Sequence, residues 1–385
     1  MELCSFERCT SCLSCYNSCP INAIRIESNS YGITQPVINV QKCKACFICH
    51  RSCPEKVQPI FRLSKKAIAL YTKHEFDKIT CSSGGAATTF ARYIISKGGS
   101  VFGATSVGGY PHFIKADSME ALEKLKGSKY VYCDPENIYK QVKDELHTGK
   151  LCLFIGTPCN IGGLLTFLKR NYENLITIDL ICHGTPPFSY LKDHIESKIG
   201  DYSKVGNFTF RGKNDFYLTV FDKDNNIIYK RNQYEDEYFM AFMQGFIFRP
   251  GCYECQYAQN KRVSDITIGD FWNLGIAALN NYKGKISVAL LNTEKSIDFF
   301  EQCNRLFYYE ERSLNEAING NDQLRHPSPR LKQRDNFIKL YIEYKSIRKV
   351  FQKMGISTKS CKNKFRRYIL YIPRIIKRLI LSNKI

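Results

Sequence analysis

The sequence holds 385 residues, 44% of them hydrophobic and 13% aromatic, and carries a formal charge of +20. This length and composition predict a globular chain of roughly two or three domains and exclude an intrinsically disordered protein. The start has no apolar signal segment, and no uncharged apolar stretch reaches the roughly 18 residues of a membrane span. We therefore expect a cytoplasmic protein whose 18 cysteines bind metal or do redox work, rather than a secreted disulfide framework.

Two similar cysteine runs open the chain. Residues 9–20 read CTSCLSCYNSCP and residues 43–54 read CKACFICHRSCP, so both follow the pattern C-x2-C-x2-C-x3-C-P. Three close cysteines of such a run wrap one [4Fe–4S] cluster, and the fourth binds the cluster of the other run. The runs therefore predict two clusters with these ligands: Cys9, Cys12, Cys15 and Cys53 for one, and Cys43, Cys46, Cys49 and Cys19 for the other.

A pair of zinc sites is the alternative for these runs, because C-x2-C also suits tetrahedral zinc. Zinc motifs usually join two C-x2-C units across a longer loop, without the third cysteine and the C-x3-C-P ending. The pattern therefore favours iron–sulfur clusters in an α+β, ferredoxin-like domain over residues 1–62.

After a charged connector over residues 64–78, strand and helix signals alternate from about residue 79. The expected elements are a helix after a Gly-rich turn (82–99), a strand (151–156), a helix (160–171), a strand (175–181), a hairpin (217–230) and two strands (264–272 and 286–292). They predict an α/β body with a partly parallel sheet and some antiparallel additions.

The Gly-rich turn is a candidate cofactor contact. Ser82, Ser83, Gly84 and Gly85 precede a helix whose first free N–H groups could bind a phosphate. A plain serine N-cap with turn glycines is the alternative, and the residues alone favour it. Lys129, within KGSKYVYCD (126–134), would suit a contact with a ring or a phosphate, but a solvated surface loop is equally consistent with its neighbours. The chain has neither a G-x-G-x-x-G fingerprint after a strand nor a P-loop.

Two further cysteines follow neighbouring strands. Cys159 comes directly after the strand at 151–155, Cys182 directly after the strand at 175–181, and one helix joins them. Such a unit makes the strands parallel, so both cysteines lie at the carboxyl edge of the sheet, where α/β proteins bind ligands. RPGCYEC supplies Cys252 and Cys255 on a turn that could fold over this edge. The four could hold a third [4Fe–4S] cluster; buried apolar cysteines and a zinc site are the alternatives.

Six motifs in this order resemble the coenzyme F420 hydrogenase/dehydrogenase beta-subunit family. They are SSGG, GSKYV, LFIGTPCNIGGL, DLICHGTPP, PGCYEC and SDITIGDFW, and they lie within residues 79–275. The resemblance implies a FAD in the body beside an additional [4Fe–4S] cluster, with Cys159, Cys182, Cys252 and Cys255 as its ligands. It also implies that the loop Ser83, Gly84, Gly85 and the turn Gly156, Thr157, Pro158 are neighbours of the flavin. Asn160 departs from the family, which often has glutamine there.

We therefore expect an iron–sulfur flavoprotein oxidoreductase that passes electrons between a ferredoxin or another redox partner, the clusters and a FAD. The resemblance leaves the substrate open, and some relatives accompany surface-polysaccharide synthesis. An electron-transfer subunit that feeds a separate catalytic partner is the alternative, and a zinc-bearing binding protein is a third class. The sequence assigns no catalytic residue.

The end of the chain is strongly basic. Residues 345–385 hold 13 Lys and Arg and no Asp or Glu, whereas the other 344 residues hold 43 basic and 36 acidic residues. Apolar positions at helical spacing, from residue 365 to residue 380, predict an amphipathic helix that suits an anionic membrane surface. A terminal helix docked on the body or on a partner is the alternative, and no nucleic-acid binding is expected.

The expected organisation has four parts. They are a two-cluster ferredoxin-like domain (1–62), the N-terminal region of the beta-subunit-like body (63–150), its C-terminal region (151–330) and a basic helical tail (331–385). We expect a cytoplasmic location, with the tail able to hold the protein on the inner face of a membrane.

Overall fold

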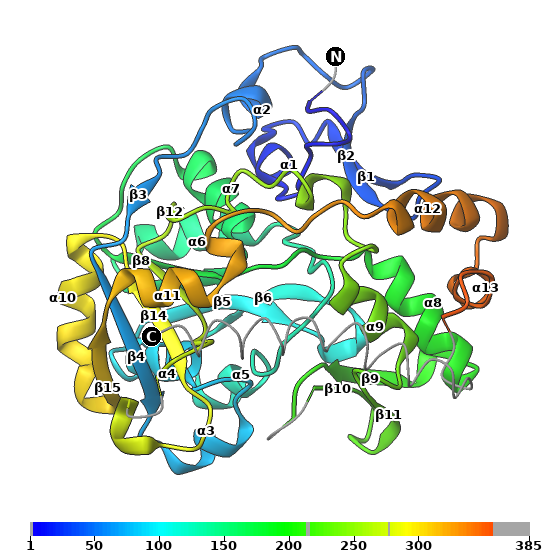
Figure 1. Ribbon diagram of the computed structural model, residues 1–385. Coiled ribbons are helices and arrows are strands. Elements are labelled where there is room, and N and C mark those ends of the chain that lie inside the picture. Colours follow the sequence, from blue (N-terminus) through cyan, green and yellow to red (C-terminus); the bar gives the residue numbers. More distant parts are fainter. Residues whose placement is uncertain (1–2, 213–215, 276–277, 357–385) are drawn as a thin grey trace.

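The computed structural model describes residues 3–212, 216–275 and 278–356 (Figure 1). The amphipathic positions predicted between residues 365 and 380 lie outside these residues. Within the described ranges, no helix combines the length and the apolar character that a membrane crossing needs.

The front region, residues 3–63, contains two short helices and one hairpin. The helices are α1 (Ser14–Ser18) and α2 (Ile48–Arg51), and β1 (Ile24–Ser28) pairs antiparallel with β2 (Thr34–Ile38). Each helix begins two residues after the second cysteine of its run. The repeated sequence thus folds as a repeated structure, as expected for a ferredoxin-like region.

The body is built on one eight-stranded sheet, in the order β15-β4-β14-β13-β8-β7-β5-β6. The strands are β4 (Lys66–Thr72), β5 (Ser100–Thr105), β6 (His112–Ala116), β7 (Cys152–Gly156), β8 (Leu175–Leu180), β13 (Ile266–Asp270), β14 (Ser287–Leu291) and β15 (Phe307–Arg312). β5, β7, β8 and β13 are parallel to one another, and the other pairings are antiparallel. The predicted α/β body with a partly parallel sheet is therefore confirmed.

Helices cover both faces of this sheet. On one face, α4 (Ala86–Ser96) and α10 (Glu294–Cys303) bury Phe90 and Phe300 against Leu153 of β7. On the other face, α6 (Ile138–His147) and α7 (Pro158–Leu168) pack on Phe154 of the same strand. Neighbouring strand residues point to opposite faces, so a strand covered on both sides is apolar throughout. The short helices α3 (Glu75–Thr80), α5 (Met119–Glu123) and α11 (Leu314–Gly320) lie at its margins.

The expectation of a charged connector over residues 64–78 is wrong. These residues contain β4, which pairs with β14 on one side and β15 on the other. Ala67, Ile68, Ala69 and Leu70 are at most 2% exposed. Charged residues lie only at the two ends of this stretch, so the short apolar strand between them was not predicted. Strands from 63–150 and from 151–330 thus share one sheet, and the boundaries predicted between those regions stay predictions.

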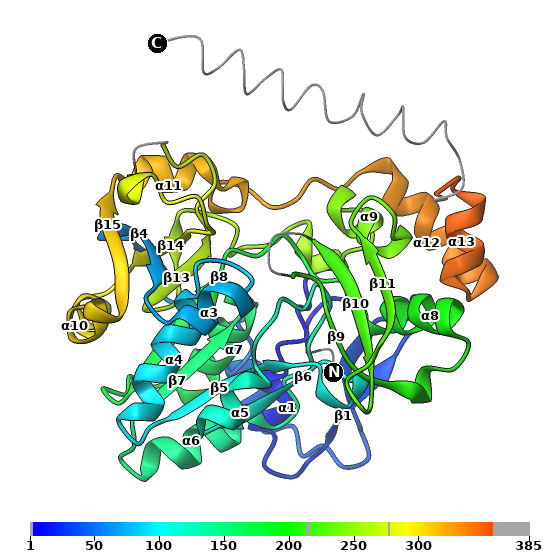
Figure 2. The same cartoon turned by 90° about the horizontal axis from the view of Figure 1, so that it is seen from below.

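A second sheet and four helices form the remaining part of the body, shown from below in Figure 2. β9 (Val205–Thr209), β10 (Tyr217–Asp222) and β11 (Ile227–Asn232) pair antiparallel, which confirms the predicted hairpin. Around them lie α8 (Phe188–Ile199), α9 (Glu237–Gln244), α12 (Lys332–Tyr344) and α13 (Ile347–Lys353), with an aromatic core between. The two-residue strands β3 (Arg62–Leu63) and β12 (Lys261–Arg262) pair where the front region meets the body.

Candidate metal centres

The structure brings the cysteines predicted for the first cluster into one buried group, here called the inner group: Cys9, Cys12, Cys15 and Cys53. Burial, followed by the nearby thiols of the other three cysteines, raises the pKa of Cys15 well above its usual range. Four mutually repelling thiolates without an added cation would be unfavourable in a buried place. The grouping therefore fits ligands around a metal cluster.

Both cysteine runs adopt the same unusual backbone. Ser11 and Leu13 in the first run, and Ala45 and Phe47 in the second, have φ between 49° and 59°. A non-glycine residue in this left-handed region costs roughly 1–3 kcal/mol and clusters at ligand-binding loops. In each run these residues flank the second cysteine, so the chain wraps around the position where a cluster would lie.

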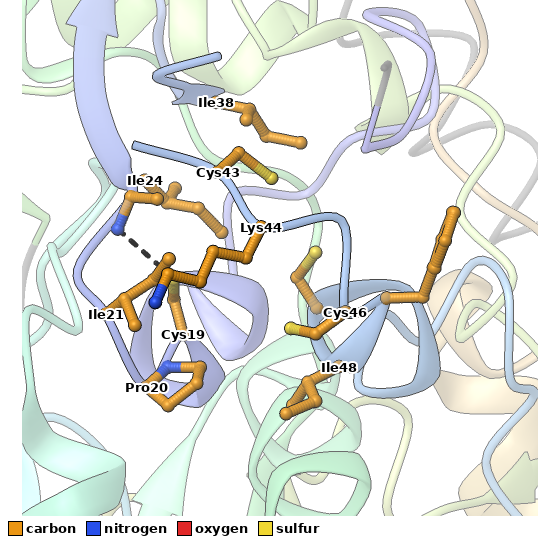
Figure 3. A pocket seen from close by; sticks show the side chains of 12 residues that line it. Cys19, Pro20, Ile21, Ile24, Ile38, Cys43, Lys44, Cys46 and Ile48 are labelled. Atoms are coloured by element: carbon orange, nitrogen blue, oxygen red, sulfur yellow. Dashed lines mark hydrogen bonds between the residues drawn. The ribbon is translucent and has the colours of Figure 1, made fainter. Parts of the chain in front are cut away.

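The second set of cysteines lines a hollow near the surface and is here called the outer group: Cys19, Cys43, Cys46 and Cys49. Figure 3 shows Cys19, Cys43 and Cys46 among the side chains that line this hollow, together with Ile24 and Ile38. Ala23 N–H donates to Cys19 Sγ at 3.2 Å, and Ala45 N–H donates to Cys43 Sγ at 3.4 Å. Backbone N–H groups aimed at sulfur stabilise thiolates and tune bound clusters.

The remaining four predicted ligands meet at the carboxyl edge of the large sheet and are here called the body group: Cys159, Cys182, Cys252 and Cys255. Burial, and then the nearby thiols of Cys252, Cys159 and Cys255, raises the pKa of Cys182 well above its usual range. Burial likewise raises the pKa of Cys159 to about 11 and that of Cys255 to about 12. The four cysteines thus lie close together, as predicted from the strand–helix–strand unit and from the loop that folds over this edge.

Local structure explains how each of these cysteines reaches this edge. β7 ends at Gly156, and a capping box between Thr157 and Asn160 starts α7, which places Cys159 in its first turn. Cys182 follows the end of the parallel neighbour β8. Cys252 closes a short 3-10 helix, and Thr185 N–H donates to its Sγ at 3.4 Å.

The spacing of the sulfur atoms disfavours zinc. Zinc–sulfur bonds of about 2.3 Å in a tetrahedron hold the four sulfur atoms roughly 4 Å apart. In the part of the chain that the structure describes, no three cysteine sulfur atoms lie within 4.8 Å of one another. The groups are therefore wider than a zinc site and suit a larger cluster.

The front region docks on the body with the inner group toward it. α1 packs against α7, Asn17 Nδ2 donates to Glu136 O at 2.8 Å, and Tyr132 OH donates to Ser11 O at 2.8 Å. A Cβ built on Gly163 of α7 would lie 2.9 Å from Cys12 Sγ of the inner group, and the first turn of this helix carries Cys159 of the body group. Cys46 of the outer group is exposed. The inner group therefore lies between the outer group and the body group.

Two residues near these groups escaped the sequence reasoning. Cys4 is hydrogen-bonded to Cys9 and Cys53, which makes it a fifth cysteine at the inner group. Arg249 is 3% exposed and donates to Ser11 Oγ, and electrostatic interactions join it to Cys9 and Cys159. Neither has a signal in the sequence, since Arg249 depends on how the front region docks on the body and Cys4 lies outside both cysteine runs.

The predicted flavin neighbours lie along the same carboxyl edge, at different strands. Ser83 and Gly84 contact Ser287 of β14, whereas Gly156 and Thr157 stand at the end of β7. Gly85, and not a serine, is the N-cap of α4, with no side-chain cap, so the serine N-cap alternative is wrong. Ser82 Oγ beside it is buried without a hydrogen-bond partner among the described residues. That orphaned hydroxyl fits a polar ligand at this loop.

Two of these residues also have packing roles. A Cβ at Gly84 would lie 2.6 Å from both Leu70 O and Ser287 N, so only glycine fits between β4 and β14. Lys129 is half-buried, and its Nζ donates to Leu125 O and Lys126 O. Burial lowers the pKa of Lys129 to about 8. Lys129 is therefore not a solvated surface residue.

Comparison with known families matches both parts of the chain. Residues 149–317 match the C terminus of the coenzyme F420 hydrogenase/dehydrogenase beta subunit, and residues 8–58 match a 4Fe-4S dicluster domain. The two ranges contain all twelve predicted cysteine ligands. The matches confirm the resemblance carried by the motifs and make the chain an iron–sulfur protein related to an oxidoreductase subunit. The comparison with curated proteins gave no match.

Among solved structures, one similar chain belongs to the xenon-derivatised F420-reducing [NiFe] hydrogenase complex from Methanosarcina barkeri. It is 16% identical, the alignment covers 76% of this chain and 92% of that chain, and the TM-score is 0.47.

Proposed function

We propose that this chain, which joins a 4Fe-4S dicluster domain to the C-terminal domain of coenzyme F420 hydrogenase/dehydrogenase beta subunits, is an iron–sulfur flavoprotein oxidoreductase. It passes electrons between an external one-electron carrier and a substrate bound in the body. The observation that carries this proposal is the spatial order of the three cysteine groups: exposed outer group, buried inner group, body group.

Each group has a distinct place in this proposal. Cys46 brings the outer group to the surface, where a partner can reach it. Cys12 places the inner group against α7, whose first turn carries Cys159 at the carboxyl edge of the large sheet. That edge is where open α/β sheets bind their ligands, so electrons that enter at the front arrive beside the place for a cofactor and a substrate.

A FAD at this edge would supply the two-electron chemistry that single-electron clusters lack. The loop Ser83, Gly84, Gly85 and the turn Gly156, Thr157, Pro158 would hold it. The orphaned Ser82 hydroxyl supports a ligand beside α4, where the N-terminus of the helix favours an anionic phosphate. Among the described residues nothing selects a substrate, so the surface-polysaccharide setting stays a prediction of the resemblance.

The chemistry around the outer group favours an acidic protein as the electron carrier, of which a ferredoxin is one kind. The outer surface combines the exposed apolar residues Ile21 and Phe47 with Lys42, Lys44 and Arg51. In the described chain, no carboxylate forms an ion pair with any of these three cations. An apolar centre with a basic rim suits a partner of complementary shape and opposite charge.

An electron-transfer subunit that feeds a separate catalytic partner is the second candidate. The packing roles of Gly84 and Lys129 favour it, because contacts with backbone atoms of this chain account for both residues without a bound flavin. In this version the body group passes electrons out of the chain, and no FAD is bound.

Counting cofactors after anaerobic purification separates these possibilities. Three [4Fe–4S] clusters predict about 12 iron and 12 sulfide per chain. One FAD with about 12 iron supports the flavoprotein, and about 12 iron without flavin supports the electron-transfer subunit. A result of about 8 iron without flavin, or of zinc in place of iron, overturns the body assignment.

Cysteine variants test the grouping itself. Replacing Cys159 and Cys255 together by serine should lower the count from about 12 to about 8 iron, because only the body group loses ligands. The control is Cys303→Ser: Cys303 is fully buried, and its thiol donates to Phe299 O within α10, away from every group. Loss of the front clusters in the double variant would contradict the grouping.

A further inference from the structure

Arg249 is a buried cation without a visible counter-charge. Its side chain is 3% exposed, and in the described part of the protein it forms no ion pair with a carboxylate. Nη2 donates to Ser11 Oγ and to Thr34 O, the latter at 3.4 Å, and the guanidinium lies 4.4 Å from the centre of the Tyr132 ring. Nε and Nη1 are buried and reach no acceptor among the described residues.

Such an arrangement is costly unless an anion is present. A buried charge with no opposite charge destabilises a fold by several kcal/mol, and buried donors are nearly always satisfied. Two free donors of a guanidinium fork are shaped for anionic acceptors. The orphaned atoms therefore indicate an anion that the protein residues do not supply.

Arg249 lies between the body group and the inner group. Its backbone belongs to the loop of the body group: Arg249 N–H donates to Thr185 O at 3.1 Å, and Cys252 N–H donates to Arg249 O at 3.0 Å. Its side chain reaches into the front region, at Ser11 and Thr34. Ser11 Oγ, which accepts from the guanidinium, lies 3.9 Å from Cys9 Sγ of the inner group, and the positive charge of Arg249 lowers the pKa of Cys9 and of Cys159 in the body group.

We propose that Arg249 is a positioning residue shared by two clusters, with its guanidinium between the cluster of the inner group and the cluster of the body group. This inference rests on the proposed function, and it assigns to Arg249 the control of electron transfer from the front region to the body. A [4Fe–4S] core with a 2+ charge and four thiolates carries about −2, and taking up one electron adds one negative charge. A fixed cation stabilises the added charge, so Arg249 raises the reduction potential of both clusters.

The electron balance of this step is simple. One electron leaves an external one-electron carrier, enters at the outer group, passes to the inner group and then to the body group, and no bond or proton is exchanged. Because Arg249 acts on both partners of the last transfer, it raises both potentials above the value for an uncompensated site.

A redox titration of the full-length holoprotein, followed by electron paramagnetic resonance, tests this role. In Arg249→Gln, the midpoint potentials of the inner and body clusters should fall, while that of the outer cluster stays at the wild-type value. Arg249→Lys, which retains the charge without the planar fork, should fall less at the same two clusters. The control is Arg92→Gln, which breaks an ion pair with buried Asp77 on the opposite side of the sheet and should move none of the three.

Unchanged potentials in a fully loaded Arg249→Gln, or an equal fall at all three clusters, would overturn the proposal. If Arg249→Gln does not load its clusters, Arg249→Met, which also removes the charge but keeps a long unbranched side chain, is titrated in its place: a fall confined to the inner and body clusters supports the role, and wild-type potentials refute it. A wild-type protein that shows no signals from the inner and body groups would instead contradict the proposed function.

Discussion

Gly163 lies on the face of α7 that meets the front region, at the closest approach to the inner group. A Cβ built on it would be 2.8 Å from Cys12 Cβ, 2.9 Å from Cys12 Sγ and 2.9 Å from Tyr139 OH. All three atoms are buried, so none can move aside easily. The absence of a side chain at this one position lets Cys12, a proposed cluster ligand, sit directly against the body.

Gly163→Ala should therefore damage the inner group, although alanine is the better helix former. We expect overpacking to cost roughly 1–3 kcal/mol in urea unfolding. Displacement of Cys12 should also lower the iron content toward about 8 per chain, as one cluster is lost.

The matched control is Leu168→Ala, at the far end of the same helix. Leu168 is 6% exposed, so its truncation should cost roughly 2–5 kcal/mol while the iron count stays at the wild-type value. A Gly163→Ala protein with full iron and wild-type stability would show that the tight contact is unimportant.

At the residue scale, the cysteine positions were predictable and their surroundings were not. The spacing of the front cysteines reflects local wrapping of one cluster, which the chain encodes over a few residues. The body group was predictable because parallel neighbouring strands bring Cys159 and Cys182 to one edge. Arg249 belongs to the contact between the front region and the body, which nothing local encodes, and Cys4 reaches the inner group from outside both cysteine runs.

At the scale of elements, β4 shows how burial overrides a local pattern. Its residues 66–72 are KAIALYT, with only one charge, but serine, lysine, histidine and glutamate on either side make the stretch look like a linker. The strand is held by β14 and β15, which come from residues more than 200 positions later. Sequence periodicity reports neighbours along the chain and not those across a sheet, so this strand was missed.

Leucine truncations inside the supposed connector and just before it measure this difference. Leu70 in β4 is fully buried among Phe90, Ile94 and their neighbours, so Leu70→Ala should lower the free energy of unfolding by roughly 2–5 kcal/mol. Leu63, seven residues earlier, is 61% exposed, so Leu63→Ala should change it by no more than about 0.5 kcal/mol. Equal effects in urea denaturation would contradict the central position of β4.

At the scale of the whole molecule, the direction of the electron path depends on which cluster faces solvent. The two cysteine runs are nearly equivalent in sequence, so the sequence alone makes either of them the entry point. Docking breaks this equivalence: Thr166 Oγ1 of α7 donates to Ser52 O at 2.7 Å, and Tyr132 OH binds Ser11 O. Contacts beside the inner group thus cover it, and the outer group is left as the only front group with a fully exposed cysteine among the described residues.

This asymmetry leads to a prediction about the outer surface. Lys42→Glu with Lys44→Glu replaces two positive charges by negative charges beside the outer group. Electrostatic steering changes association rates by a factor of ten or more, so we expect electron transfer from an acidic ferredoxin-type carrier to slow by roughly tenfold at low salt. At about 1 M salt the difference from the wild-type protein should shrink, because the Debye length falls to about 3 Å.

Stopped-flow reduction of the clusters measures both rates, and two comparisons make the result specific. Lys97→Glu with Lys124→Glu changes the net charge equally, but both lysines lie by α4 and α5, on the side of the sheet away from the front region, so this variant should behave as the wild-type protein does. Reduction by dithionite, a small donor that needs no docking surface, should be similar in all three proteins. If both double variants slow equally with the acidic carrier, net charge and not the outer surface governs the encounter. If neither slows, electrons enter elsewhere, and the exposed outer group is not the entry point.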